Sequence, residues 1–365
     1  MNVLAFVQAW DADDPANGFI VEWMASLAGR VAMLTVVALR VNPSTPFPRS
    51  GMRLHSLGKE RYAGFGRSAL YLRRFHRIVP GILATDSIDV IFTHMTPTYS
   101  LCAWPYARFR RIPIVTWFAH PRRSIRLAAA DAVSARVVTA VAGSYPYPGA
   151  KVIPIGHGIN MRLFSPASLS RGMISPGQSR PLLISAGRIA PIKRHEILID
   201  ALSVLKSRGM PCDAVFVGNP AVAEDLPYAA MLRARVRHGD LDRHITFASG
   251  IPRSALPERY RSACACVNLT SDGSFDKAAL EAMACGMPTI VASANFKDIL
   301  GPYADMLLFS GTDAEGLAGR IAAVAALSAG DRIALGAHLR SQVMRSHGLG
   351  GCMDRLVGIL RSASA

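Results

Sequence analysis

The sequence predicts an α/β protein built from two consecutive domains, each with a parallel sheet. Its 365 residues are many for one compact core and comfortable for two. Short apolar runs alternate with longer segments of helical periodicity, as in successive βαβ units. A segment rich in Ser, Pro and Gly at residues 166–180 interrupts this alternation, and an apolar run at residues 181–186 restarts it. We therefore expect the linker between the domains at this segment.

In the first half, apolar runs predict the buried strands of one parallel sheet, at residues 2–8, 32–41, 89–92, 113–119, 137–142 and 151–155. A helix is expected over residues 19–28. Gly18 stands directly before it, where a missing side chain lets a ligand phosphate or sugar approach the backbone. Asp11, Asp13 and Asp14 precede that glycine. Carboxylates suit magnesium or manganese, but we prefer a solvated loop because no further acidic cluster follows nearby.

Positive charge is concentrated in the first 165 residues, which hold 19 Lys and Arg against 8 Asp and Glu. Eight of the basic residues are mixed with aromatic ones: Arg49, Arg53, Lys59, Arg61, Arg67, Arg73, Arg74 and Arg77. This pattern favours an anionic partner, either a membrane surface or a phosphorylated acceptor. A solvated helix face is an equally open interpretation. Nucleic acid is not expected, since the chain has no zinc-finger spacing, RRM signature or Lys/Arg run.

His120 follows the expected strand at residues 113–119, at the edge where open α/β sheets bind ligands. A single histidine is more often structural than catalytic, but this position favours a function for His120 and less so for His94. In the loop IGHGIN, His157 lies between two glycines, where the backbone must bend sharply.

The six cysteines are scattered, mostly within apolar runs, and are expected to be reduced, buried thiols of a cytosolic protein. Cys264 and Cys266 lie two residues apart on an expected strand. A metal pair is conceivable there, but no His or acidic partner is close in sequence, so buried thiols are favoured. The N-terminus lacks the features of a signal peptide, and the uncharged residues 90–107 are not typical of a membrane span. A soluble or peripherally attached protein is expected.

The second half predicts another sheet, with strands at residues 181–186, 214–218, 244–247, 264–269, 289–293 and 305–309. Helices are expected at residues 196–207, 228–238, 314–327, 331–345 and 353–361, the last with no strand after it. Arg188 and Lys193 flank the turn between the first strand and the first helix. Two fixed cations there can neutralise a diphosphate. Surface charge is the alternative, and the Gly and Pro residues in the turn favour the functional interpretation.

Residues 271–288, SDGSFDKAALEAMACGMP, predict a loop, a short helix and a terminator within a strand–loop–helix–strand unit. The helix N-terminus would then lie at the carboxyl edge of the sheet. Glu281, a turn further in, can accept hydrogen bonds from a ribose. The backbone amides expected to face an anion are those of Lys277, Ala278, Ala279 and Leu280. No GxGxxG fingerprint, Walker A loop or HExxH motif occurs, which argues against dinucleotide-binding, P-loop and zincin proteins.

Four segments, AGRIAPIKRHEILIDAL, VFVGNP, LDRHITFASGIP and LEAMACGMP, resemble in order and spacing the C-terminal domain of family 4 retaining glycosyltransferases. VIPIGHGIN resembles the segment entering that domain, so the resemblance is strong over residues 151–293 and weaker before them. It implies the GT-B architecture, with two Rossmann-like domains facing across a cleft. The acceptor-binding domain would be residues 1–165 and the nucleotide-sugar-binding domain residues 166–345. Residues 346–365 would form a helix crossing back to the first domain.

The resemblance also implies roles for single residues. Arg188 and Lys193 would hold the donor diphosphate, and Glu281 would bind the donor ribose. Ile251 and Pro252 would border the base. His120 matches the histidine near the sugar in several members, and Gly18 matches the N-terminal glycine close to the phosphates. No metal or other cofactor would be required.

One position departs from the family pattern. The first glutamate of the usual E-x7-E pair is replaced by Gly273, although Phe275 still fits. GSFDKAALEAMACG resembles a subgroup that carries Gly-Ser and Asp-Lys in this segment. The sugar contacts must then come from elsewhere, with Asp272 and Asp276 as the nearest candidates. Lys277 could contact the sugar or phosphate, or it could simply pair with Glu281 one turn further on.

Together these features predict a retaining hexosyltransferase that moves a sugar from a UDP- or GDP-sugar to a glycan or lipid-linked acceptor. The expected setting is cell-envelope or exopolysaccharide biosynthesis, in the cytoplasm or at the inner face of an anionic membrane. Two other classes stay open. A non-catalytic GT-B subunit, binding a nucleotide sugar or a partner enzyme, is suggested by Gly273, and a sugar-nucleotide epimerase shares the fold.

Overall fold

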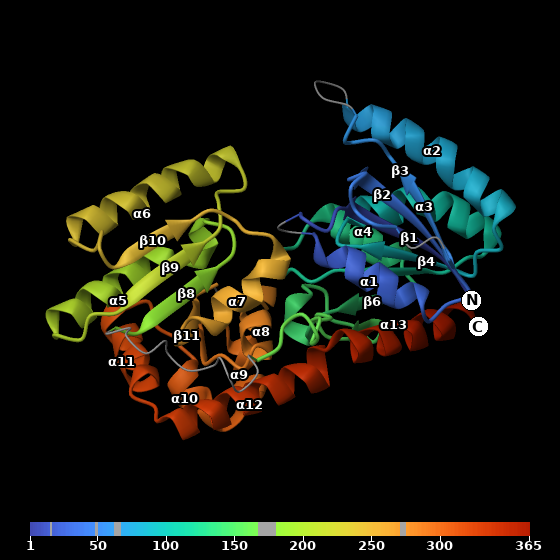
Figure 1. The fold of residues 1–365 in the computed structure, drawn as a ribbon. Coiled ribbons are helices and arrows are strands. Elements are labelled where there is room, and N and C mark those ends of the chain that lie inside the picture. The colour runs from blue at the N-terminus through green and yellow to red at the C-terminus, as the bar shows by residue number, and fades with distance from the viewer. Residues whose placement is uncertain (15–16, 48–49, 62–66, 167–179, 271–274) are drawn as a thin grey trace. The chain divides into compact units, whose positions relative to one another are not determined.

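The computed structural model describes residues 1–14, 17–47, 50–61, 67–166, 180–270 and 275–365. These residues form two compact units, each drawn in Figure 1. Unit 1 comprises Met1–Gly158 and Ser346–Ala365, and unit 2 comprises Ile159–Arg345. The boundary after Gly158 precedes the segment expected as a linker, of which residues 167–179 lie outside the described part. No helix within the described ranges is both long enough and apolar enough to span a bilayer.

Unit 1 contains a sheet of seven parallel strands in the order β3-β2-β1-β4-β5-β6-β7. The strands are β1 (Asn2–Trp10), β2 (Met33–Val41), β3 (Met52–Ser56), β4 (Val90–His94), β5 (Ile114–Trp117), β6 (Arg136–Thr139) and β7 (Val152–Pro154). The helices are α1 (Phe19–Ala28), α2 (Arg67–Thr85), α3 (Pro97–Arg110), α4 (Ile125–Val133) and α13 (Leu349–Ser364), with a 3-10 turn η1 (Ala142–Ser144). The edge strand β3 was not expected, because MRLHS has only two apolar residues and lies within the basic segment.

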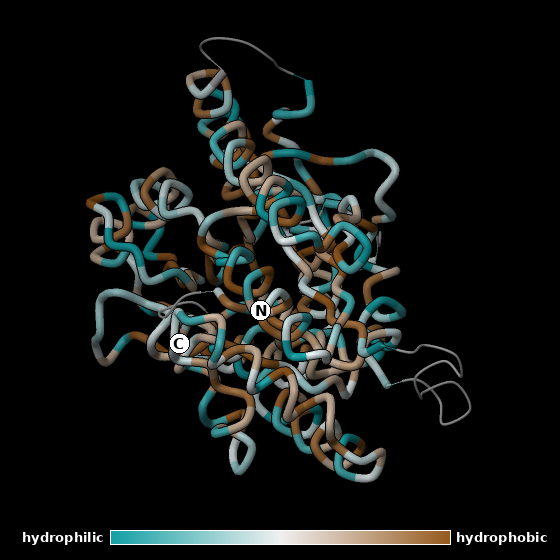
Figure 2. The backbone as a smooth tube through the Cα atoms, turned by 90° about the vertical axis from the view of Figure 1, so that its left-hand side faces the viewer, coloured by the Kyte–Doolittle hydropathy of each residue, from teal (hydrophilic) through white to brown (hydrophobic). Residues whose placement is uncertain are grey.

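The core of unit 1 forms where α2 and α3 pack on the sheet. Phe6 of β1 is fully buried, and its ring stacks with those of Phe75 and Tyr99 at centroid distances of 5.1 and 5.7 Å. Figure 2 shows hydrophobic and hydrophilic segments interleaved along the backbone. His94 is buried and its ring lies parallel to that of Trp117. His94 therefore belongs to the packed interior.

The C-terminal helix α13 is part of unit 1, where it packs against α1. Its buried stripe consists of Cys352, Met353, Leu356, Val357 and Leu360. Arg30 forms a salt bridge with Asp354 at 2.7 Å. The helix begins at Leu349, four residues before the expected start, because the first turn carries two glycines that weaken the sequence signal.

The backbone bends sharply on both sides of His157, as expected. Gly156 and Gly158 have φ values of +86° and +62°. A Cβ atom on Gly158 would lie 2.5 Å from Nε1 of Trp23, so this position excludes any larger residue. The carbonyl oxygen of Gly158 accepts a hydrogen bond from the same Nε1 at 3.0 Å.

In the acidic loop after β1, Asp13 is exposed as the preferred interpretation expects, but that interpretation is wrong for Asp11 and Asp14. Asp11 is buried, and its Oδ2 lies 3.2 Å from Nη2 of Arg40 on β2. Asp14 forms a salt bridge with the same guanidinium. Asn42 donates a hydrogen bond to Asp11 at 3.0 Å. The loop thus neutralises Arg40, and the described residues contain no cluster of His, Cys, Asp and Glu that could hold a metal.

Unit 2 contains five parallel strands in the order β10-β9-β8-β11-β12. The strands are β8 (Leu182–Ala186), β9 (Asp213–Val217), β10 (Ile245–Ala248), β11 (Ala265–Asn268) and β12 (Thr289–Val291). The longer helices are α5 (His195–Ser207), α6 (Leu226–His238), α7 (Leu256–Arg261), α8 (Lys277–Ala284), α11 (Ala314–Ala325) and α12 (Ala329–His347). The short elements are η2 (Pro191–Lys193), η3 (Ala223–Asp225), η4 (Arg253–Ala255), η5 (Ala294–Phe296), α9 (Lys297–Leu300), η6 (Gly301–Tyr303) and α10 (Ala304–Leu307). Cys264 and Cys266 are buried free thiols.

The prediction of a strand at residues 305–309 is wrong. Residues 304–307 form the helical turn α10, and only Leu308 bridges to Val291 of β12. Leu307 and Phe309 are both buried, and this pair of apolar residues produced the strand-like pattern. The expected terminator of α8 is confirmed, because Gly286 follows the helix with φ +76°.

Candidate functional site

The candidate site of unit 2 lies at the centre of its sheet, where β8 adjoins β11. The strand order reverses there, so the loops after β8 and β11 diverge and leave room at the carboxyl edge. Gly187 follows β8 with φ +130°, and Gly218 follows β9 with φ +154°. A Cβ atom on Gly218 would lie 2.0 Å from the carbonyl oxygen of Gly187. The two loops therefore touch through their backbones, which requires glycine at position 218.

Lys193 reaches this edge from η2 and forms a salt bridge with Asp276, with both side chains largely buried. Asp276 accepts further hydrogen bonds from the Asn268 amide at 2.9 Å and the Thr270 hydroxyl at 2.8 Å. Burial by itself would raise the pKa of Asp276. The charge of Lys193 and these donors outweigh burial and hold that pKa well below its usual range. Asp276 is therefore a carboxylate at neutral pH, fixed by several donors.

Asp276 is also the N-cap of α8. Its Oδ1 accepts a hydrogen bond from the backbone amide of Ala278 at 3.1 Å. The expectation that this amide points at an external anion is therefore wrong, because the chain's own carboxylate occupies it. The side chains of Ala279 and Leu280 are buried in the core. Asp272 and Gly273, at the departure from the E-x7-E pattern, lie outside the described residues.

Glu281 pairs with Arg253, a residue that the sequence did not single out. Nε and Nη2 of Arg253 both donate to Oε1 of Glu281 at 3.1 Å, and the two side chains are 12% and 7% exposed. Within the described residues Oε2 accepts no hydrogen bond, so it remains able to bind a hydroxyl. Burial raises the pKa of Glu281, while the charges of Arg253 and Lys277 oppose that rise. The guanidinium also lies 4.8 Å from the centroid of the Phe164 ring.

Arg188 and Lys193 do not converge on one carboxylate. Nε of Arg188 lies 3.8 Å from Oδ2 of Asp225, and the Arg188 side chain is half exposed. An ion pair of this length and exposure contributes little to stability. Arg188 is therefore able to leave Asp225 for a stronger anion, whereas Lys193 is held in place by Asp276.

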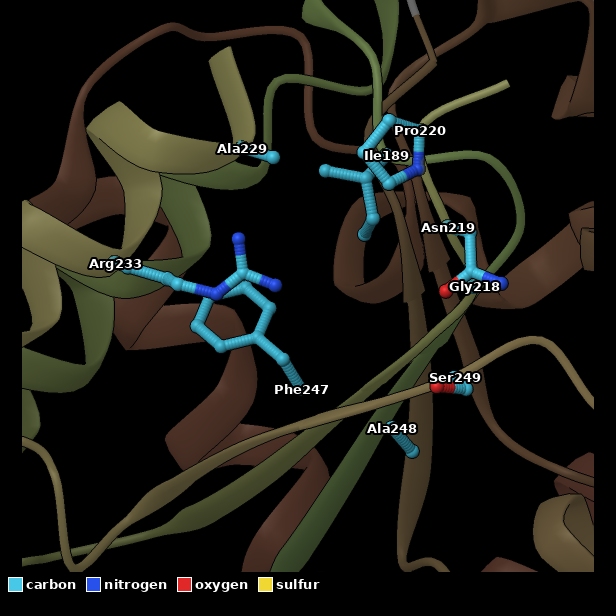
Figure 3. Close-up of a pocket in the computed structure, with 9 residues that line it drawn as sticks. All are labelled: Ile189, Gly218, Asn219, Pro220, Ala229, Arg233, Phe247, Ala248 and Ser249. Carbon is cyan, nitrogen blue, oxygen red and sulfur yellow. The ribbon is translucent and has the colours of Figure 1, made fainter. Parts of the chain in front are cut away.

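A pocket opens beside these loops, at the carboxyl ends of β9 and β10 (Figure 3). It is lined by Ile189, Gly218, Asn219, Pro220, Ala229, Arg233, Phe247, Ala248 and Ser249. The guanidinium of Arg233, on α6, lies over the ring of Phe247 with its carbon 5.4 Å from the centroid. Ile251, half-buried, and Pro252, exposed, follow two and three residues after Ser249. The lining thus combines apolar side chains with the polar Asn219 and Ser249 and one cation, Arg233.

His120 and Gly18 belong to unit 1. His120 is exposed, three residues beyond β5, and its Nδ1 accepts a hydrogen bond from the backbone amide of Arg122 at 3.0 Å. Burial of part of the ring and the charge of Arg122 lower the pKa of His120. A Cβ atom on Gly18 would lie 2.5 Å from the carbonyl oxygen of Ala12. The course of the loop itself therefore requires glycine at position 18, whether or not a ligand binds there.

Four side chains at the site were not predicted from the sequence: Asn268, Thr270, Arg253 and Arg233. The first two had a signal, because they are polar residues at the carboxyl end of an apolar strand. Arg253 had none, since its partner Glu281 is 28 residues further along the chain.

His195 is the first residue of α5 and follows Lys193 and Arg194 in the sequence. Its environment leads us to expect that the stability of unit 2 decreases at acidic pH. The ring is buried against Phe216, and its Nδ1 has no hydrogen-bond partner among the described residues. Burial, and then the charge of Lys193, lower the pKa of His195 to about 3. Between pH ~6.5 and this value the unfolded chain binds a proton that the folded chain does not. Stability should therefore fall by about 1.4 kcal/mol per pH unit as the pH decreases.

The measurement is the free energy of unfolding from urea titrations at pH 7.5, 6.5 and 5.5, for the wild type and His195→Leu. The variant should lose this contribution, so its stability should depend less steeply on pH below 6.5. Equal slopes for the two proteins would show that His195 is not kept neutral by burial.

Residues 173–332 match the family model described as Glycosyl transferases group 1. D-inositol 3-phosphate glycosyltransferase of Jonesia denitrificans is 31% identical over 153 residues, which cover 39% of this chain and 35% of that protein. Mannosylfructose-phosphate synthase of Agrobacterium fabrum is 31% identical over 144 residues, 38% and 32% of the two chains. The chain thus spans about a third of the length of these two relatives.

Solved structures resemble the whole chain. Sucrose-phosphate synthase from Thermosynechococcus elongatus superposes with a TM-score of 0.79 and 19% identity, covering 99% of both chains. HepE of Anabaena, in complex with UDP and glucose, gives a TM-score of 0.77 with 14% identity, covering 99% of this chain and 100% of HepE. At such identities the likeness shows the fold alone. The expected GT-B fold is confirmed.

Proposed function

Because residues 173–332 match the family model described as Glycosyl transferases group 1 and the chain has a GT-B fold, we propose that the protein transfers a sugar from a nucleotide diphosphate donor to an acceptor hydroxyl. The observation that carries this proposal is the placement of Lys193. Its ammonium is held by Asp276 at the point where the strand order of unit 2 reverses. Open α/β sheets bind their ligands at such points.

The donor diphosphate is proposed to bind at Lys193. A Cβ atom on Gly187 would lie 3.2 Å from Nζ of Lys193, so the ammonium lies directly over a residue without a side chain. An ammonium has three donors, and Asp276 needs only one of them. Arg188, half exposed and weakly paired with Asp225, would turn to the same diphosphate. Together the two cations would stabilise the negative charge that develops as the diphosphate leaves.

The nucleoside is proposed to lie beyond the diphosphate. Oε2 of Glu281 is available to accept a hydrogen bond from a ribose hydroxyl, while Oε1 is held by Arg253. The ring of Phe247 is stacked on Phe216 and covered by the guanidinium of Arg233, so a planar base would stack on that guanidinium from the pocket side, and Ile251 and Pro252 would border it. HepE, which shares the fold, is in complex with UDP, and this supports a uridine nucleotide as one donor to test.

The transfer is proposed to retain the anomeric configuration, with the acceptor hydroxyl attacking from the face that the diphosphate leaves. His120, kept neutral by its lowered pKa, accepts a hydrogen bond at Nδ1 from the backbone amide of Arg122, so its Nε2–H would donate a hydrogen bond to the sugar or to the acceptor. Since Arg188 and Lys193 supply the positive charge, we expect transfer to persist in the presence of EDTA. A glycan or lipid-linked acceptor, in cell-envelope or exopolysaccharide assembly at the cytoplasmic side, fits the net charge of the first 165 residues.

The test offers UDP- and GDP-hexoses to the full chain, first in thermal unfolding and then in product analysis by mass spectrometry. One donor should raise the midpoint of unfolding, because a ligand that binds only the native state stabilises it. That donor should be hydrolysed slowly alone and should transfer its sugar when an acceptor is present. Binding without hydrolysis or transfer would identify a non-catalytic subunit. A sugar nucleotide of unchanged mass but altered configuration would identify an epimerase.

A further inference from the structure

Exposed aromatic side chains stand among arginines on the outer faces of α2 and α3 in unit 1. Trp104 and Phe109 of α3 are 43% and 89% exposed, and Leu72 of α2 is 45% exposed. The arginines on the same exposed faces, or directly after α3, are Arg73, Arg77, Arg108 and Arg111. We refer to these seven residues as the α2–α3 surface.

The two helices form one continuous surface. Residues from both belong to a single core cluster, in which Val79 of α2 and Ala103 of α3 face the sheet. Nδ1 of His76 and the hydroxyl of Tyr106 are joined by a hydrogen bond of 2.8 Å between the helices. Near their C-terminal ends, Arg110 donates to the carbonyl oxygen of Leu83. α2 and α3 therefore lie side by side, as Figure 1 also shows, and present their outer faces together.

The charge of this surface is not neutralised. The sequences of α2 and α3 contain no Asp or Glu. Among the residues that the structure describes, no carboxylate forms a salt bridge with the four arginines of the surface. Other arginines of unit 1 do form salt bridges, as Arg53 does with Asp86 and Arg40 with Asp11. The surface thus combines an uncompensated positive charge with apolar rings that are exposed to water.

We propose that the α2–α3 surface docks the protein on an anionic lipid bilayer. Amphipathic helices with Trp, Phe and Leu beside Arg lie in the interface of such a bilayer. Their rings enter the headgroup region and their guanidinium groups bind phosphates. Nucleic acid fits less well, because base stacking uses aromatic residues that line a charged groove, whereas these rings stand on the outside of helices. The inference deepens the proposed function, since a lipid-linked acceptor lies at a bilayer surface, but lipid binding is measured apart from sugar transfer.

The chain carries its own probe for this test. It contains four tryptophans, of which Trp10, Trp23 and Trp117 are buried and Trp104 is exposed. When phosphatidylglycerol vesicles are added, the tryptophan fluorescence of the full chain should shift to shorter wavelength as Trp104 enters the bilayer. Lipids with brominated acyl chains should quench this fluorescence. Phosphatidylcholine vesicles should cause neither effect. Binding measured by co-sedimentation should weaken at least about tenfold between ~0.05 and ~0.5 M salt, because the Debye length becomes shorter than the charge separation.

Three variants locate the contact. Phe109→Ser and the pair Arg73→Glu with Arg77→Glu should each weaken binding at least about tenfold, because they remove a ring or invert the attracting charge. The matched control on α6, Met231→Ser with Arg237→Glu, alters an exposed apolar residue and an exposed arginine in unit 2 and should bind like the wild type. Donor hydrolysis should be unchanged in all of them, so loss of lipid binding is distinguishable from loss of the proposed activity.

The proposal is overturned if the wild type binds neither vesicle or binds both equally, or if the control loses as much binding as Phe109→Ser. It is also overturned if the chain binds duplex DNA and the phosphatidylglycerol vesicles alike and Phe109→Ser weakens neither. That result would show general attraction to polyanions.

Discussion

Lys193→Met is expected to lower kcat about 10²–10³-fold, as is typical when one preorganised donor to a developing negative charge is removed. The substitution keeps most of the length of the side chain and removes its ammonium group, with the charge and the N–H donors. If Lys193 stabilises the leaving diphosphate, the effect should fall mainly on kcat, and the KM for the donor should change less. The measurement is steady-state transfer, or donor hydrolysis, with the donor identified by thermal unfolding.

Loss of stability must be separated from this loss of catalysis. Without Lys193, the carboxylate of Asp276 stays buried without its cation, and breaking such a pair costs about 3–5 kcal/mol. The double variant Lys193→Met with Asp276→Asn removes both charges, while the amide can still accept hydrogen bonds from Asn268 and Thr270. We expect it to recover most of the lost stability and none of the lost kcat. Recovery of activity in the double variant would show that Lys193 serves only to neutralise Asp276.

Arg188→Met provides the comparison. Arg188 is half exposed and its contact with Asp225 is 3.8 Å long, so its removal should leave the free energy of unfolding nearly unchanged. The kcat of Arg188→Met should still fall if both Arg188 and Lys193 bind the diphosphate. Wild-type activity in Arg188→Met would leave Lys193 as the cation responsible for the leaving group.

Arg253→Met is expected to destabilise unit 2 by about 3–5 kcal/mol and to raise the KM for the donor. The substitution leaves Glu281 buried without its guanidinium partner. Burial raises the pKa of Glu281, and Arg253 is the first of the charges that oppose this rise. In the variant the carboxyl should therefore hold its proton to a higher pH. A protonated Glu281 binds a ribose hydroxyl more weakly than a carboxylate does.

The pH dependence of KM tests this second prediction. In Arg253→Met the KM for the donor should decrease with rising pH as Glu281 ionises, over a range that lies at higher pH than in the wild type. Arg259→Met is the matched control, because Arg259 is an exposed residue of the neighbouring α7 and should tolerate the change. An identical pH dependence in wild type and Arg253→Met would contradict the assignment of Glu281 to the ribose. A double-mutant cycle with Glu281→Gln should give a coupling of about 0.5–3 kcal/mol.

The sequence was sufficient to predict those helices and strands that depend only on residues close together in the chain. The buried parallel strand β1, the short helix α8 and its end at Gly286 follow from apolar runs and from a glycine that adopts positive φ. The same signals predicted that Lys193 and the start of α8, which carries Glu281, lie at the carboxyl edge of the second sheet, because the loop after a parallel strand begins at that edge. They did not distinguish the apolar residues of α10 from a strand, because a pair of buried residues fits both periodicities.

Which charged side chains form ion pairs could be seen only in the tertiary structure. Asp276 was expected to contact the donor, yet it holds Lys193, 83 residues away in the sequence, and caps α8 with its other oxygen. Glu281 is fixed by Arg253 from a different loop. Gly18, expected to make room for a ligand, is required by the carbonyl oxygen of Ala12. The physical reason is common to all three. Secondary structure depends on neighbours within a few residues, whereas a buried ion pair or a close backbone contact depends on how separate loops pack at one edge of a sheet.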